Sequence, residues 1–350
     1  MRRSLGYRRA ALLASLLVGV LLAACGGGGA SEGEEAVGSA GGGEGEGRVA
    51  VVTTVAPLRS IIENVAGDRA RVTALVPEGA NSHTFEPPPS AAELLAEADL
   101  IVLNGLQLEL PTLELARANA DEERLLLLGD RTIRSDEYVF DFSFPESDGN
   151  PNPHLWTSPA LSVRYADLVR EGLSDADPAG ALYYADNFER FRAQLEALDV
   201  MIAKTTATIP VGNRKLLTYH DSFPFFGPRY GLEIIGAIQP SDFSEPSPRE
   251  VASLVEQIRE AGVPAIFGSE VFPSEVLDVI AAEVGAVQVS TLRDDDLPGE
   301  PGDAENTLVA MLVENVRTMT LALGGDASAL EGFAVGDTWR GFAQFQAEEG

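Results

Sequence analysis

The apolar residues from Arg48 onward form short runs that alternate with stretches of helical periodicity. The short runs predict buried strands, and the stretches between them, for example residues 89–98 and 248–261, predict helices. Alternation of this kind in both halves predicts an α/β fold of two lobes, each with a largely parallel sheet flanked by helices. The predicted strands are residues 49–55, 72–76, 100–103 and 125–128 in the first half, and 216–219, 265–268 and 287–291 in the second.

Residues 181–205 lie between the two halves and have the apolar spacing of a single long helix. At 1.5 Å per residue such a helix is about 38 Å long, enough to run along both lobes. It is either an ordinary packing helix or a rigid connection between the lobes, and we favour the second because the pattern predicts no other helix of this length. The apolar positions are Tyr184, Phe188, Phe191, Leu195, Leu198 and Ile202.

These patterns divide the body into an N-terminal lobe at 48–180, the linking helix at 181–205 and a C-terminal lobe at 206–324. Residues 325–350 are rich in Gly, Ala and Glu with scattered aromatic residues, and the sequence assigns this tail no role.

Composition supports a folded, acidic protein. Of the 350 residues 45% are hydrophobic, which is enough for a sizeable core. Asp and Glu number 54 against 25 Lys and Arg, giving a formal net charge of -29. Because such a surface repels phosphate backbones, nucleic acid is not an expected partner.

The first 24 residues have the pattern of a secretory signal peptide, with arginines at the start followed by an apolar run of about fifteen residues. Cys25 is the one cysteine of the chain, which excludes an internal disulfide and a Cys-rich zinc site. Residues 22–25, Leu-Ala-Ala-Cys, resemble the lipobox of bacterial lipoproteins. That resemblance implies a lipid on Cys25 and an extracytoplasmic protein anchored to the bacterial cell membrane. The alternative is an ordinary signal peptide followed by an incidental cysteine.

Residues 25–47 are rich in Gly, Ser, Glu and Ala and have almost no apolar side chains. A segment of this composition cannot bury surface and is expected to act as a flexible tether.

The chain has three histidines, and each lies in a predicted loop. His83 follows the strand that ends near Val76, His154 lies in a Pro- and Gly-rich loop, and His220 stands directly at a strand end. The acidic run 294–296 follows another strand. In open α/β sheets the loops after the carboxyl ends of strands line the ligand crevice, so these groups can meet there.

Imidazoles together with a carboxylate match the ligand preferences of Zn²⁺, and also of Mn²⁺ or Fe²⁺. The successive histidines are 71 and 66 residues apart, which excludes a zinc finger or a His-Glu-x-x-His helix. Only the fold can assemble such a site. From the spacing alone, scattered surface or buried structural histidines remain an alternative.

Five motifs follow one another along the chain. They are Ser-His-Thr-Phe-Glu-Pro (82–87), Asn-Pro-His-Leu-Trp (152–156), Tyr-His-Asp-Ser-Phe (219–223) with Tyr-Gly-Leu (230–232), Ile-Phe-Gly-Ser-Glu (266–270) and Asp-Asp-Leu (295–297). In this order they resemble the solute-binding lipoproteins of ABC importers for zinc and manganese, of the ZnuA, PsaA and TroA types. The similarity covers about residues 49–324.

The resemblance implies that His83, His154 and His220 are nitrogen ligands of one metal ion. The fourth ligand it implies is an acid of the C-terminal lobe, Asp295, which matches the family's Asp-x-Leu. Asp294 and Asp296 are immediate neighbours of Asp295 and stay open as alternatives.

Other residues of these motifs are expected beside the ligands rather than among them. Glu270 matches a recurrent acid at a strand end. Glu86 and Asp221 are candidates for orienting the imidazoles, with a helix cap or a solvated carboxylate as the alternative. Trp156 and Phe85 are expected to form apolar walls.

Two departures from the family pattern bear on the choice of metal. Residues 135–152 lack the histidines of the metal-scavenging loop that many zinc-specific members carry. His220 stands where many manganese-type relatives have Glu, and three nitrogens with one oxygen suit tetrahedral Zn²⁺. Zinc is therefore the favoured ion, with manganese as the alternative.

The resemblance implies a receptor that captures a divalent metal outside the cytoplasm and delivers it to a cognate ABC permease in the membrane, and not an enzyme. One alternative is a surface adhesin or interaction lipoprotein. The other is a secreted zinc hydrolase, in which Glu270 serves as the base and Asp295 is not a ligand.

Overall fold

The structure is a computed structural model that describes residues 47–340 with the exception of Pro273. These residues belong to one compact unit, Gly45–Gly350. The predicted signal peptide, the lipid-bearing Cys25 and nearly all of the tether lie outside the described residues, as do residues 341–350 of the tail. Within the described range, no helix combines the length and the apolarity needed to cross a bilayer.

The N-terminal lobe is built on a four-stranded parallel sheet of order β2-β1-β3-β4. Successive residues of a strand point to opposite faces, so Val51 joins the core under α1 and α5, and Val52 joins the cluster under α2 and α3. The elements are β1 (Val49–Thr53), α1 (Ala56–Ala66), β2 (Ala70–Ala74), α2 (Ala91–Glu97), β3 (Leu100–Leu103), α3 (Leu110–Asn119), β4 (Leu125–Leu127), α4 (Leu128–Thr132) and α5 (Pro159–Ala176).

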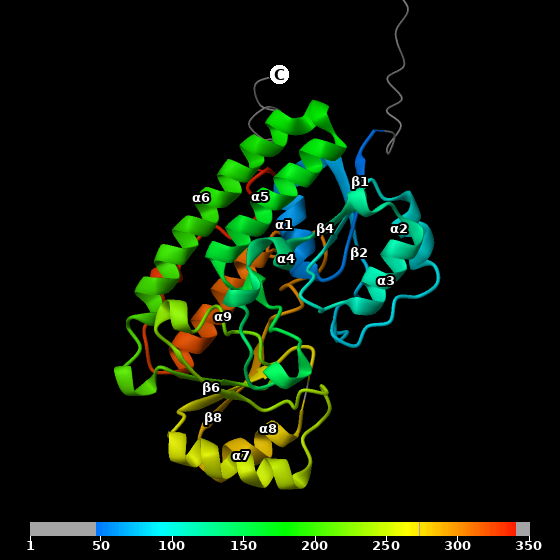
Figure 1. The fold of residues 1–350 in the computed structure, drawn as a ribbon. Coiled ribbons are helices and arrows are strands. Elements are labelled where there is room, and N and C mark those ends of the chain that lie inside the picture. The colour runs from blue at the N-terminus through cyan, green and yellow to red at the C-terminus, as the bar shows by residue number, and fades with distance from the viewer. Residues whose placement is uncertain (1–46, 273, 341–350) are drawn as a thin grey trace, which may run out of the picture. The chain divides into compact units, whose positions relative to one another are not determined.

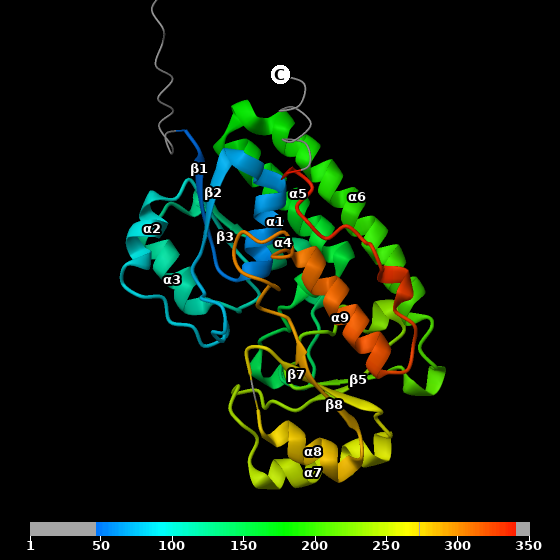
Figure 2. The ribbon, with the colours of Figure 1, turned by 180° about the vertical axis from the view of Figure 1, so that it is seen from behind.

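The C-terminal lobe repeats this plan with a four-stranded parallel sheet of order β6-β5-β7-β8. Helices α7 and α8 cover one face of the sheet, and α9 lies on the other (Figures 1 and 2). The two-lobe α/β prediction is confirmed. The elements are β5 (Lys215–Thr218), β6 (Glu233–Ala237), α7 (Pro248–Ala261), β7 (Ala265–Ser269), α8 (Val276–Val284), β8 (Val287–Leu292) and α9 (Leu308–Ala322).

Helix α6 (Ala181–Thr206) connects the two lobes, and all six of its predicted apolar positions are buried. At its C-terminal half, Asp199 accepts hydrogen bonds of 2.6 Å from Arg229 and from the hydroxyl of Tyr230, which attaches the helix to the C-terminal lobe. It is not the one long helix of the chain, because α5 has 18 residues and runs beside it (Figure 1). The apolar pattern did not predict α5, because two of the buried positions of this helix are the small residues Ser162 and Ala166.

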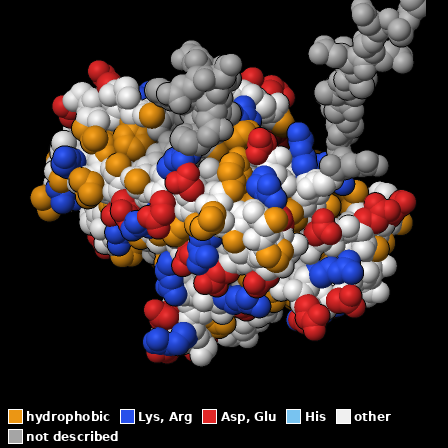
Figure 3. Space-filling model, turned by 90° about the horizontal axis from the view of Figure 1, so that it is seen from above, with side chains coloured by type: hydrophobic (Ala, Val, Ile, Leu, Met, Phe, Trp, Pro, Cys, Tyr) orange, Lys and Arg blue, Asp and Glu red, His pale blue; other side chains and the backbone are white. Residues whose placement is uncertain are grey.

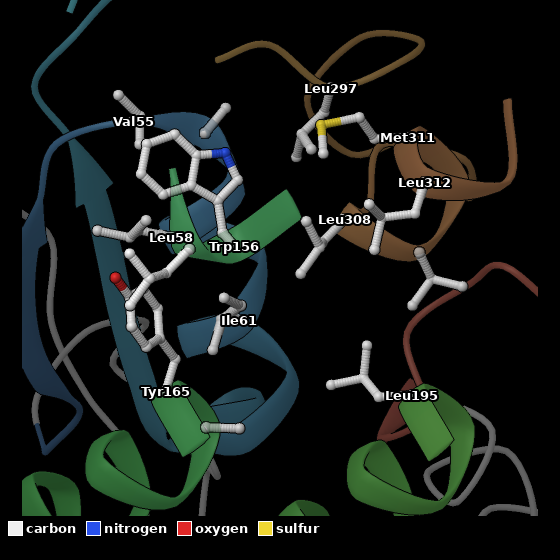
Figure 4. Close-up of a cluster of buried hydrophobic side chains, with 14 of the residues drawn as sticks. Val55, Leu58, Ile61, Trp156, Tyr165, Leu195, Leu297, Leu308, Met311 and Leu312 are labelled. Atoms are coloured by element: carbon white, nitrogen blue, oxygen red, sulfur yellow. The ribbon is translucent and has the colours of Figure 1, made fainter. Parts of the chain in front are cut away.

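The main hydrophobic core continues from one lobe into the other. Trp156 lies fully buried in it, close to Leu58 and Ile61 of α1, with Leu308 and Met311 of α9 in the same cluster (Figure 4). The indole therefore belongs to a core that residues of both lobes share.

The described part of the tail packs on the body. Leu330 is buried, the carboxylate of Asp337 accepts a 2.9 Å hydrogen bond from the amide of Asn64 in α1, and the carbonyl of Ala334 accepts one of 2.9 Å from Gln194 in α6. This segment fastens α1 and α6 to the end of the chain.

On the face drawn in Figure 3, acidic and basic side chains are interspersed rather than gathered into one patch.

Candidate metal centre

The fold brings the three histidines together. Their Nε2 atoms are 3.3 Å apart between His83 and His154, 3.2 Å between His83 and His220, and 3.1 Å between His220 and His154. Three nitrogens at about 2.05 Å from a tetrahedral Zn²⁺ would be about 3.3 Å apart, so the separations fit one shared ion. Among the described residues, these are the three metal-ligating side chains whose donor atoms converge, within 4.8 Å of one another.

The local chain explains why each imidazole reaches this point. His220 lies two residues after the end of β5, His83 lies in the loop after β2, and His154 precedes the short turn Leu155–Thr157 that leads into α5. His154 and His220 are buried, and His83 is partly exposed. The cluster therefore lies where loops of both lobes meet.

Side-chain amides contact the Nδ1 atoms of two of the three imidazoles. The Oδ1 atom of Asn152 lies 2.8 Å from Nδ1 of His154, and the Oε1 atom of Gln239 lies 2.7 Å from Nδ1 of His220. Because an amide oxygen only accepts, each Nδ1 must carry the proton, which leaves the Nε2 lone pair directed at the other imidazoles. Both rings are thus set in the tautomer that binds a metal.

Burial keeps the imidazoles neutral. It lowers the pKa of His220 to about 4 and lowers the pKa values of His83 and His154 well below 6.5, with repulsion from the neighbouring rings adding to the effect in these two. Neutral imidazole is the form that ligates a metal ion, so the cluster is ready for one at neutral pH.

Among the acids of the loop 294–296, Asp294 comes nearest, with its Oδ2 3.9 Å from Nε2 of His220. Asp295 is held elsewhere: its Oδ2 accepts a short hydrogen bond from Ser82, and its buried Oδ1 has no hydrogen-bond partner. Asp296 accepts a 2.8 Å bond from the backbone of Gly79. Asp295 stays a prediction as the fourth ligand, and its free Oδ1 is the atom available for that role.

Glu270 holds the acidic loop. Its Oε1 accepts the backbone N–H groups of Asp294, Asp295 and Asp296 at 2.8, 3.2 and 3.1 Å. A carboxylate engaged in this way fixes the position of the loop and is poorly placed to act as a general base.

The remaining predicted residues differ in their positions. The carbonyl of Asp221 accepts a 2.7 Å hydrogen bond from Asn152, so Asp221 acts on His154 through that amide. Glu86 is exposed, and among the described hydrogen bonds none joins it to an imidazole. The ring of Trp156 lies 5.1 Å from that of His154 and forms a wall, whereas Phe85 packs against the main core.

Sequence reasoning missed Gln239, Phe144 and Phe243. The rings of Phe144 and Phe243 lie 5.5 and 4.3 Å from that of His83. Gln239 follows β6, and the sequence pattern did not predict that strand, so the neighbourhood of Gln239 and His220 was not foreseen. Asn152 lay inside a quoted motif, where its place two residues before a histidine was the available signal.

Comparison with known proteins places this site in a family context. The chain is 28% identical to the manganese-binding lipoprotein MntA of Halalkalibacterium halodurans over 280 residues, which cover 80% of this chain and 90% of that protein. It is 27% identical to the iron-binding protein YfeA of Yersinia pestis over 277 residues, 78% of this chain and 86% of that protein.

The zinc-binding protein TroA of Treponema pallidum is similar in both sequence and structure. The sequences are 28% identical over 282 residues, 79% of this chain and 90% of that protein. The solved structure of TroA superposes with a TM-score of 0.72 at 26% identity, covering 79% of this chain and 99% of that one. The resemblance recognised in the sequence is confirmed: residues 51–322 match the model of the zinc-uptake complex component A, periplasmic, and the chain belongs to that family of metal-binding ABC transporter proteins.

Proposed function

We propose that this protein is the extracytoplasmic substrate-binding lipoprotein of an ABC importer, which captures one divalent transition metal ion and delivers it to a membrane permease. The observation that carries the proposal is the convergence of three buried or partly buried Nε2 atoms within 3.1–3.3 Å of one another. The Nε2 lone pairs of His154 and His220 are buried and directed into this cluster, and an ion bound there would satisfy both together with Nε2 of His83.

We propose His83, His154, His220 and Asp295 as the ligand set. In this ligand set the unpartnered Oδ1 of Asp295 would bind the ion, and a turn of the side chain toward the imidazoles would break the bond from Ser82. Asp294 is the competing acid, because it starts closer to His220. Separate Asp→Asn variants at 294 and 295 distinguish them. The variant at the ligand should lower metal affinity by more than the roughly tenfold to hundredfold that loss of a residue orienting a ligand costs, and the other variant should lower it less.

Zinc is the ion we propose as cargo, with manganese as the alternative. Three imidazoles and one carboxylate suit tetrahedral Zn²⁺, whereas Mn²⁺ favours more oxygen ligands. The relatives are named for manganese, iron and zinc, so the proposal for this chain depends on its own donor set.

The proposed anchor is the lipid on Cys25, which lies outside the described residues. It is supported by the lipobox-like sequence and by the lipoprotein name of MntA. Mass spectrometry of the protein isolated from its own membrane tests it, and an unmodified Cys25 would contradict it.

The test of the function is a competition titration of the metal-free mature chain with Zn²⁺ and Mn²⁺, together with elemental analysis. We expect one tightly bound zinc per chain, and loss of most of the affinity in His154→Ala. Glu86→Ala is the matched control, because that side chain is exposed and should leave affinity unchanged. Hydrolysis of ester, peptide or phosphate substrates that is lost when the histidines are replaced would favour the zinc hydrolase. Surface binding that survives their replacement would favour the adhesin.

A further inference from the structure

A cavity of about 300 Å³ opens beside His83 at the junction of the two lobes. Residues of the loop after β3 and of the segment 143–153 line it from one side, and Ser241 and Phe243 line it from the other. Of the three imidazoles in the cluster, His83 is the one that lines this cavity. The cavity is therefore a route from outside to the ion site that reaches His83 first.

The walls of the cavity suit the passage of a cation. Most are apolar or proline side chains, and among the described residues that line it Asp148 is the one acidic side chain. No Lys or Arg is among these lining residues, so the route carries no positive charge that would repel a divalent ion.

Phe243 covers the imidazole at the inner end of this route. Its ring stacks on that of His83 with centroids 4.3 Å apart and an interplanar angle of 14°. The backbone of Phe243 has φ +59, a left-handed conformation that is unfavourable for a bulky residue. In the described part of the chain the other non-glycine residues with positive φ are Leu106 and Gln107, and both line the same cavity. Strain is thus concentrated around this cavity, as at many functional sites.

One amide connects this covering residue to a second imidazole. The Nε2 atom of Gln239 donates a 3.2 Å hydrogen bond to the carbonyl of Phe243, and its Oε1 lies 2.7 Å from Nδ1 of His220. Gln239 is buried, and its bond with His220 is shielded from water, whereas its bond to Phe243 is partly buried. A movement of Phe243 therefore disturbs the residue that orients His220.

From these contacts we propose that Phe243 is a gate between the cavity and the metal centre, and that Gln239 is a positioning residue that fastens the gate to His220. The inference rests on the proposed metal-binding function. In the closed state the ring of Phe243 covers His83, and the ion enters or leaves when the ring turns away from His83 and clears the inner end of the cavity. A gate changes the rates of entry and exit together and leaves the equilibrium affinity nearly unchanged.

The test measures zinc association and dissociation by stopped flow with a chromophoric zinc chelator, on the mature protein. Because an aromatic stack is worth about 0.5–1.5 kcal/mol, Phe243→Ala should speed both association and dissociation by up to about tenfold, with the dissociation constant nearly unchanged. Phe243→Gly should do the same while relieving the backbone strain. Phe142→Ala is the matched control, since Phe142 is an exposed phenylalanine of the neighbouring loop that does not line the cavity.

Variants of Gln239 separate its two bonds. Gln239→Glu keeps an acceptor for Nδ1–H of His220 but loses the donor to Phe243, so it should exchange zinc faster with its affinity retained. Gln239→Ala loses both bonds and should lower affinity as well.

Rates in Phe243→Ala equal to those of the wild type would overturn the gate while leaving the proposed function intact. A loss of affinity in Phe243→Ala that appears in the dissociation rate alone would also overturn it, because the ring would then stabilise the bound state. A wild-type protein that binds no ion would overturn both the gate and the proposed function.

Discussion

The indole of Trp156 donates a 2.7 Å hydrogen bond from Nε1 to the carbonyl of Asp294. Trp156 follows His154 by two residues and is fully buried in the core, whereas Asp294 begins the acidic loop that approaches His220. The bond therefore connects the loop that carries the proposed ligand His154 to the acidic loop 294–296. It also makes the position of the acidic loop dependent on the packing of the core.

Trp156→Phe tests this connection. The substitution keeps an aromatic ring but leaves the buried carbonyl of Asp294 without its donor, so we expect a loss of about 1–3 kcal/mol in the free energy of unfolding and weaker zinc binding. Chemical denaturation and zinc titration measure the two effects. A destabilised protein with unchanged affinity would show that the loop keeps its place without the indole.

Asn152 provides a test of how the imidazoles are oriented. Asn152→Ala removes the acceptor for Nδ1–H of His154, and we expect zinc affinity to fall by about tenfold to a hundredfold. Asn152→Asp retains the acceptor but loses the donor to the carbonyl of Asp221, so its affinity should lie between those of Asn152→Ala and the wild type. The control is Asn119→Ala, an exposed asparagine of α3, and equal affinities for Asn152→Ala and this control would contradict the assignment.

Glu270 is predicted to hold the acidic loop and not to ligate the ion. Glu270→Gln keeps an acceptor for the three backbone N–H groups and should bind zinc nearly as the wild type does, whereas Glu270→Ala should lower affinity by about tenfold or more. Titration of both variants measures this. If Glu270→Gln bound as poorly as Glu270→Ala, the carboxylate charge itself would be required, as for a ligand.

Glu109 gives the metal-free protein a pH dependence that is independent of the imidazoles. Burial raises the pKa of Glu109 to about 7, although its Oε1 accepts hydrogen bonds from the backbone of Asn104 and from Thr54. Because the folded-state pKa lies above the unfolded value of 4.5, the folded protein prefers the protonated acid. Its contribution to stability is present below pH 4.5 and is lost as the pH rises through 7.

Glu109→Gln mimics the neutral acid and should remove this dependence. At pH 8 we expect the metal-free variant to be more stable than the wild type by about 3 kcal/mol, with the difference vanishing near pH 4.5. Urea unfolding at several pH values between 4.5 and 8 measures it. A variant less stable than the wild type at pH 8 would mean that the carboxylate is stabilising in the folded state.

The sequence predicted the two-lobe α/β fold because its strands are mostly short, continuous apolar runs. It did not predict β6 (Glu233–Ala237), an edge strand of the second sheet, although the apolar run at residues 234–238 was a signal that could have indicated it. Because β6 was not predicted, the sequence pattern could not place the loop that carries Gln239 and Phe243 next to His220. The omission of Gln239 and Phe243 therefore traces to one missed strand, whereas Phe144 lies in the loop before Asn152 and was missed separately.

The choice among the three acids illustrates a different limit. Asp294, Asp295 and Asp296 are chemically identical and adjacent, so no pattern of residue types separates them. What distinguishes them is their contacts: the backbone of Gly79 holds Asp296, and Ser82 holds one oxygen of Asp295. Such contacts link residues more than 200 positions apart and follow only from the assembled fold.

The most direct test of the central claim is X-ray absorption spectroscopy of the mature chain loaded with one equivalent of zinc. The account predicts three imidazole nitrogens and one carboxylate oxygen at about 2.0–2.1 Å from the ion, and one imidazole fewer in His83→Ala. Zinc coordinated by fewer than three imidazoles in the wild type, or a spectrum unchanged by His83→Ala, would contradict it.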